Sequence, residues 1–157
     1  MPIITLHTEI NAPIDRYFDL ARSIDLHKIS TEHTKEAAID GVTSGLINLD
    51  EWVTWKAVHF GISHTLSPKI TRFERPAFFV DQMVKGAFKK LIHEHHFEST
   101  ENGTRMTDCF DYESPFGFLG QLVDFVVLKR YMTNLLTRRN ETIKEFAESE
   151  KWRLVLR

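Results

Sequence analysis

Histidines and carboxylates alternate with apolar residues along two neighbouring segments, 88–97 and 104–112, and these polar residues could do chemistry. The Thr-Glu-Asn-Gly sequence between the segments predicts a tight turn. Because strand side chains alternate between the two faces of a sheet, this hairpin places His95 opposite Asp108, on the face that also carries His93. A histidine oriented by a carboxylate can hold a polar ligand group or transfer a proton.

The same alternation, extended to the preceding segments, predicts one apolar sheet face that carries ionisable groups. A turn at 57–58 places Trp55 opposite Phe60. A turn at 73–76 adds the following strand to the same face. The predicted ligand-contact residues on this face, with two from the C-terminal helix, are Glu51, Trp55, Phe60, His64, Phe79, Asp81, Met83, Leu91, His93, His95, Asp108, Phe110, Tyr112, Phe125 and Met132.

Three uses of the polar groups on this face are open. Unpaired buried charges are costly, so the groups can pair with one another or reach water at the sheet edge. Alternatively, His95 and Asp108 fix the polar group of an otherwise apolar ligand. In the third use they are the catalytic candidates, a histidine and its orienting carboxylate that enolise or dehydrate a carbonyl substrate.

Metal chelation is a separate alternative for the same strand. His93 and His95 lie on one face about 7 Å apart at the backbone, and Asp108 could be a third ligand. No cysteine joins this set, and we expect neither a bound metal nor a cofactor.

Hydrophobic periodicity predicts the elements that position these residues. A strand at 3–10 precedes two short helices, which are followed by about six antiparallel strands. Apolar residues then recur at helical spacing from 118 to 149, a segment without proline or glycine after Gly120. One long helix across a curved antiparallel sheet is an α+β arrangement, and the whole chain, 1–157, is expected to be a single domain.

Composition excludes several classes of protein. The net charge of −2 and the scattered basic residues give no reason to expect nucleic acid. The single cysteine, Cys109, excludes an internal disulfide and is compatible with a reducing cytoplasm, where we expect the protein. We find no signal peptide and no run of transmembrane length. The start of the long helix has little polar face, so it is either buried on both sides or forms a homodimer face or a lipophilic portal.

The element order resembles the START-like, or SRPBCC, superfamily of helix-grip domains, which includes the birch pollen allergen and aromatase/cyclase domains. A closer similarity, to a bacterial branch of ligand-binding SRPBCC proteins, is carried by the segments 53–61, 75–81, 93–97, 103–108 and 114–120. The resemblance implies about seven curved strands around a long C-terminal helix, with a hydrophobic cavity between them. It implies no particular reaction.

We therefore expect the protein to bind a small, mostly hydrophobic molecule between sheet and helix, as a carrier or sensor. The alternative is an enzyme of the polyketide cyclase or dehydratase type, a lyase or isomerase, that uses His95 and Asp108. A second alternative is a protein-interaction module with a vestigial cavity.

Overall fold

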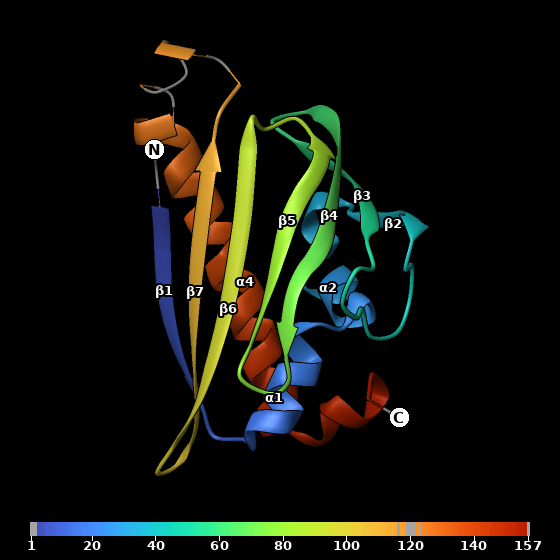
Figure 1. Ribbon diagram of the computed structural model, residues 1–157, viewed down its shortest axis with the longest axis vertical. Helices are drawn as coiled ribbons and strands as arrows, with labels where there is room; N and C mark the ends of the chain where they lie inside the picture. The colour runs from blue at the N-terminus through green and yellow to red at the C-terminus, as the bar shows by residue number, and fades with distance from the viewer. Residues whose placement is uncertain (1–2, 116, 119–121, 123, 157) are drawn as a thin grey trace.

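A seven-stranded antiparallel sheet dominates the computed structural model, which describes residues 3–115, 117–118, 122 and 124–156 (Figure 1). The order of strands across the sheet is β1-β7-β6-β5-β4-β3-β2. The first two strands in the chain therefore lie at opposite edges. The strands are β1 (Ile3–Ile10), β2 (Ala37–Gly41), β3 (Val53–His59), β4 (Ile62–Glu74), β5 (Phe78–Gly86), β6 (Lys90–Thr100) and β7 (Gly103–Glu113).

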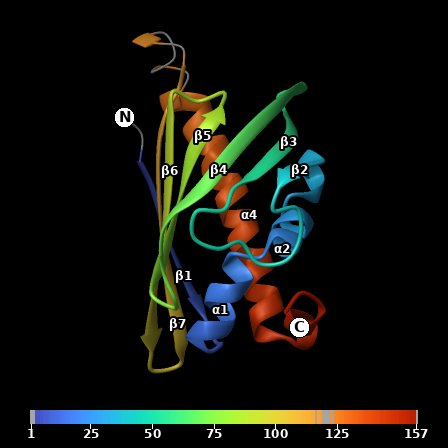
Figure 2. The same ribbon diagram turned by 45° about the vertical axis from the view of Figure 1, so that its right-hand side comes forward.

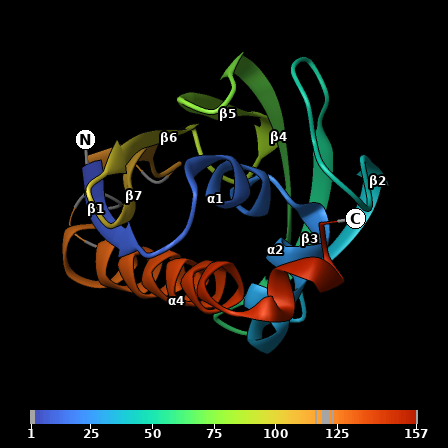
Figure 3. The same ribbon diagram turned by 90° about the horizontal axis from the view of Figure 1, so that it is seen from below.

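Helices fill the concave side of this sheet. Figure 3 shows the sheet curving around α1, with α4 along the remaining open side, and Figure 2 shows α4 crossing behind the strands. This architecture confirms the predicted helix-grip fold. The helical segments are α1 (Ile14–Ala21), α2 (Ile24–Ser30), η1 (Glu32–Thr34), the π-helical η2 (Asp124–Leu128), α4 (Lys129–Glu148) and η3 (Glu150–Leu154).

The first turns of the two short helices are closed by hydrogen bonds to the residues that precede them. The Pro13 carbonyl accepts the backbone N–H of Tyr17 in the first turn of α1. The Ser23 hydroxyl accepts the backbone N–H of Leu26, which satisfies a donor that α2 leaves unpaired. Tyr17 and Phe18 of α1 are fully buried, so this helix closes one end of the space between sheet and α4.

The long C-terminal helix is confirmed over the part that the structure describes. The π-helical η2 leads directly into α4, which is 20 residues and about 30 Å long. Residues 119–121 and 123 of the predicted helix lie outside the described residues. In the described part of the chain, no helix is both long and apolar enough to span a membrane.

The interior divides into two apolar clusters. The first cluster surrounds α1 and the C-terminal half of α4, and it includes Phe18, Phe97 and Ile143. The second cluster lies beside the N-terminal half of α4, with Ile4, Leu91, Phe110, Tyr112 and Leu136 buried. The side chains packed against the second cluster remain partly accessible; they are Leu6, Leu66, Met83, Phe88, Leu128 and Met132.

Strand register is confirmed in one hairpin and differs in two. In β6–β7, His95 lies opposite Asp108, as predicted. In β3–β4, the turn is at 60–61 and Trp55 pairs with Leu66 instead of Phe60. The β4–β5 hairpin also differs: its turn lies at 75–77, and two register shifts leave Val84 of β5 and Thr71 of β4 without an opposite residue.

Candidate functional site

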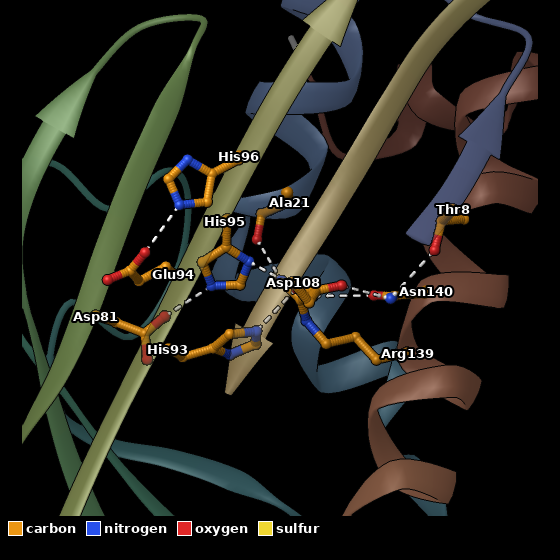
Figure 4. Close-up of polar contacts among 10 residues, drawn as sticks. All are labelled: Thr8, Ala21, Asp81, His93, Glu94, His95, His96, Asp108, Arg139 and Asn140. Carbon is orange, nitrogen blue, oxygen red and sulfur yellow. Dashed lines mark hydrogen bonds and ion pairs between the residues drawn. The ribbon is translucent and has the colours of Figure 1, made fainter. Parts of the chain in front are cut away.

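A buried cluster of two histidines and two carboxylates lies on the inner face of three adjacent strands. Asp81 comes from β5, His93 and His95 from β6, and Asp108 from β7 (Figure 4). Alternation along each strand directs these side chains toward α4. The cluster lies at the boundary between the two apolar clusters, since the ring of His95 stacks on Phe79 and that of His93 packs edge-on against Phe110.

Asp108 is fully buried and is the acceptor at the centre of the cluster. Its Oδ1 lies 2.8 Å from His93 Nε2, and its Oδ2 accepts from Asn140 Nδ2 at 2.6 Å. Because an ionised carboxylate only accepts hydrogen bonds, His93 carries its proton on Nε2. Burial alone would raise the pKa of Asp108, but the two histidines hold it well below the usual range. Asp108 is therefore a buried, ionised carboxylate with partners.

His95 lies between two carboxylates. Its Nε2 donates to Asp81 Oδ2 at 2.9 Å. Its Nδ1 lies 3.2 Å from Asp108 Oδ1, without the geometry of a hydrogen bond. Burial alone would lower the pKa of His95, but Asp108 and Asp81 raise it. This favours a charged imidazolium that holds the two carboxylates together.

The pKa of His93 is shifted in the opposite direction from that of His95. Burial lowers its pKa, and the adjacent His95 lowers it further, against the opposing effect of Asp108. A neutral His93 with its proton on Nε2 presents a lone pair at Nδ1, and no described residue hydrogen-bonds that atom. Asp81 likewise has one oxygen, Oδ1, without a partner among the described residues, and its side chain is 19% exposed.

Helix α4 contributes two polar residues that the sequence analysis missed. Asn140 orients Asp108 and also lies 3.3 Å from Thr8 Oγ1 on β1. Arg139 is buried, and it donates to the carbonyl of Ala21 at 2.9 Å. The signal was present in the sequence, because Asn140 lies four residues after Leu136 on the buried stripe of the helix, where an apolar residue is expected.

The other predicted contact residues lie in different environments. Glu51 precedes β3, and its carboxylate accepts from the backbone of Asn48. Phe60 is 61% exposed in the β3–β4 turn, and the side chain of Phe125 lies outside the described part of the structure. Met83, Met132 and His64 are partly buried. Those buried in the interior are Trp55, Phe79, Leu91, Phe110 and Tyr112.

A second polar cluster, which the sequence analysis did not identify, links α2, β3 and α4. Glu36 accepts from His27 Nε2 at 2.8 Å, and His59 Nδ1 lies 2.6 Å from the hydroxyl of Tyr131. Burial would raise the pKa of Glu36, but His27 and, more weakly, His59 lower it. Burial lowers the pKa of His59.

Apolar side chains are exposed in η2 and in the residues just before it. Phe118 is 87% exposed, and Leu122, Val126 and Val127 are also exposed. These residues are therefore not buried on both sides, which leaves the portal and dimer-face alternatives for this segment. A separate open groove of about 780 Å³ lies at the other end of the molecule, beside α1 and η3.

Comparisons with known proteins bear on the fold. No family profile matches this sequence, and no curated protein matches it. Among solved structures, TTHA0849 from Thermus thermophilus is 19% identical, with a TM-score of 0.71 over 90% of this chain and 97% of that one. The ginseng major latex-like protein 151 from Panax ginseng is 14% identical, with a TM-score of 0.66 over 94% and 98% of the two chains.

A third solved structure, Ara h 8.0201, has a TM-score of 0.65 at 12% identity over 93% of this chain and 97% of that chain. The seven-stranded antiparallel sheet, the long C-terminal helix and the two short helices after β1 agree with these similarities. The chain therefore has the helix-grip fold of the START-like, birch-pollen-allergen-like proteins.

Proposed function

We propose that the protein binds a small, mostly apolar molecule between its sheet and the N-terminal half of α4. The observation that carries this proposal is the incomplete burial of the second cluster. Leu66, Met83 and Met132 face the interior beside that cluster but remain partly accessible. Apolar side chains that stay partly accessible on the helix-covered face of a curved sheet are typical of small-molecule sites.

A polar group on the ligand is the second part of the proposal. Asp81 Oδ1 and His93 Nδ1 lack partners among the described residues. They lie where the second apolar cluster borders the buried histidine–carboxylate cluster. An apolar ligand with a hydrogen-bond donor would satisfy one of these two acceptor atoms, whereas a hydrocarbon would leave both unpaired at a cost of about 1–3 kcal/mol.

Binding without turnover is the function that the hydrogen bonds favour. A general base needs a free lone pair, and both ring nitrogens of His95 face carboxylates. We therefore propose a carrier or sensor. If the chain is an enzyme, His93 is the better candidate base, because its Nδ1 is free of protein partners among the described residues.

Titration with 1-aminoanthracene, an uncharged fluorophore whose apolar rings carry one amino donor, tests the proposal. We expect saturable fluorescence enhancement at one site per chain. Met132→Trp, which adds bulk beside the second apolar cluster, should weaken binding at least about tenfold, the equivalent of about 1.4 kcal/mol.

The matched control is Asn134→Trp, which adds the same bulk on the exposed side of α4. Equal loss of binding in both variants, or no saturable binding by the parent protein, would contradict the proposed site. The second outcome would favour the interaction-module alternative.

A further inference from the structure

We propose that Asp81, His93 and His95 form a binding site for a divalent transition-metal ion, with Asp108 as the outer partner that orients His93. One ligand atom from each of the three residues lies within 4.8 Å of the others. Four ligands arranged tetrahedrally around Zn²⁺ at its usual bond lengths lie about 3.3 Å apart. Small side-chain shifts therefore bring the three atoms into coordinating range.

The donor set indicates the class of ion. Two imidazoles and one carboxylate suit Zn²⁺, Fe²⁺, Co²⁺ or Ni²⁺, whereas Mg²⁺ and Ca²⁺ prefer oxygen ligands alone. Three protein ligands leave at least one coordination position open. The open position would be available to water or to the polar group of a bound molecule.

The surroundings of His93 resemble those of a metal ligand. Asp108 Oδ1 accepts the Nε2 hydrogen bond at 2.8 Å and leaves Nδ1 as the coordinating nitrogen. Asn140 in turn fixes Asp108 through a 2.6 Å hydrogen bond. A carboxylate behind a ligating histidine, itself held by a further donor, sets the tautomer and the direction of the ring.

His95 and Asp81 must exchange one partner to bind the ion. The proton between His95 Nε2 and Asp81 Oδ2, 2.9 Å apart, leaves to solvent, and the ion takes its place. Phe79 stacks on the His95 ring at 4.2 Å and Phe110 packs on the His93 ring at 5.1 Å, so both rings are already oriented. The 19% exposure of the Asp81 side chain gives a small ion access.

From the sequence, Asp108 could be the third ligand beside His93 and His95, although no bound metal is expected. In the structure, Asp81 rather than Asp108 has a ligand atom close to those of both histidines. Asp81 is opposite His93 across β5–β6. The site needs no apolar ligand, so it stands or falls separately from the function proposed above.

Calorimetric titration of the chelator-stripped, full-length chain with Zn²⁺ tests the proposal. We expect one ion per chain, with affinity reduced at least about tenfold in His93→Gln and in Asp81→Asn. Asp108→Asn should reduce affinity about 10–100-fold, as outer partners of metal ligands do. The matched control is His96→Gln, because His96 forms the same kind of pair with Glu94 but lies exposed on the outer face of β6.

Absence of Zn²⁺ binding by the parent chain, or binding that is lost in His96→Gln and kept in His93→Gln, would overturn the site. Substitution of a buried histidine can also impair folding, so a measurement on the unmodified chain is needed. Bound Co²⁺ should give the intense visible absorption of a four- or five-coordinate ion. The weak absorption of six-coordinate, surface-bound Co²⁺ would count against the proposal.

Discussion

At the scale of single residues, the interior of this protein keeps a fully buried carboxylate ionised by surrounding it with donors. Asp108 accepts from His93 and Asn140 and lies within 3.2 Å of His95. An isolated buried charge would cost several kcal/mol, so each of these contacts offsets part of that cost. The three partners come from β6 and α4, and the carboxylate therefore connects the sheet to the helix.

Glu36 predicts how stability should depend on pH. Burial raises the pKa of Glu36, but His27, His59 and Thr31 together outweigh it, so the folded-state pKa is below the ordinary value of 4.5. The unfolded chain therefore binds the proton more readily, and the stabilisation is present above that value and is lost as pH falls. Glu36→Gln should lower the free energy of unfolding by about 1–3 kcal/mol near neutral pH.

Urea unfolding at a series of pH values measures this effect. The difference between the parent and Glu36→Gln should shrink toward zero as pH falls below the folded-state pKa. Glu32→Gln, at an exposed position of η1, should leave stability nearly unchanged at every pH. A difference between the parent and Glu36→Gln that is constant with pH would contradict the role of the Glu36 charge.

Part of the candidate site could be predicted from the sequence. Alternation correctly brought His95 and Asp108 to the same face as opposite residues, because a short hairpin fixes which residues face each other. The hydrogen bond to Asp108 nevertheless comes from the diagonal neighbour His93. Which histidine bonds to Asp108 depends on the directions of the side chains, which strand pairing does not determine. Asn140 reaches Asp108 only because α4 packs against the sheet.

At the scale of elements, the β6–β7 turn depends on Gly103. A Cβ atom at this position would lie 2.1 Å from the backbone oxygen of Ile10, at the end of β1. Gly103→Ala should therefore force β1 and β7 apart and destabilise the protein by more than about 2 kcal/mol, in the range of strong steric substitutions.

Thermal and urea unfolding of Gly103→Ala can be compared with Gly61→Ala. Gly61 has φ of 74°, but a Cβ atom added there would have no neighbouring atom within 4 Å. Gly61→Ala should therefore lower the free energy of unfolding only by the cost of a left-handed backbone conformation at alanine, about 1 kcal/mol. If the two variants were equally stable, close approach of β1 would not be what requires glycine at position 103.

The hairpins show why register was predictable in one place and not in others. The β6–β7 turn contains Asn102-Gly103, a strong local signal. In β3–β4, Phe60 has φ of 53° in the turn, a left-handed conformation that a bulky side chain rarely adopts. Sequence reasoning therefore placed that turn earlier. The two register shifts between β4 and β5, one in each strand, depend on how the sheet bends around the helices, which no local pattern encodes.

At the scale of the whole molecule, the C-terminal segment packs against the first helix. The Arg16 guanidinium lies 4.4 Å from the centre of the Trp152 ring, and Val155 and Leu156 pack against the first cluster. Trp152→Ala should lower the free energy of unfolding by about 1–3 kcal/mol through lost apolar burial and lost cation–π contact.

Chemical denaturation measures this contribution, with Leu154→Ala as the control, because Leu154 is 66% exposed in the same segment. We expect the control to lie within about 0.5 kcal/mol of the parent. An unchanged midpoint for Trp152→Ala would mean that η3 does not contribute to the stability of the domain.

The strand order has a consequence for how the chain folds during synthesis. Every neighbouring pair from β2 to β7 is consecutive in the chain, whereas β1 pairs with β7, with Ile4 opposite Phe110. A ribosome adds roughly 5–20 residues per second, so the first strand waits about 5–20 s for its partner. Until then, β1 presents a free edge next to unburied apolar residues of α1, and this is the interval in which a nascent-chain chaperone would protect the protein most.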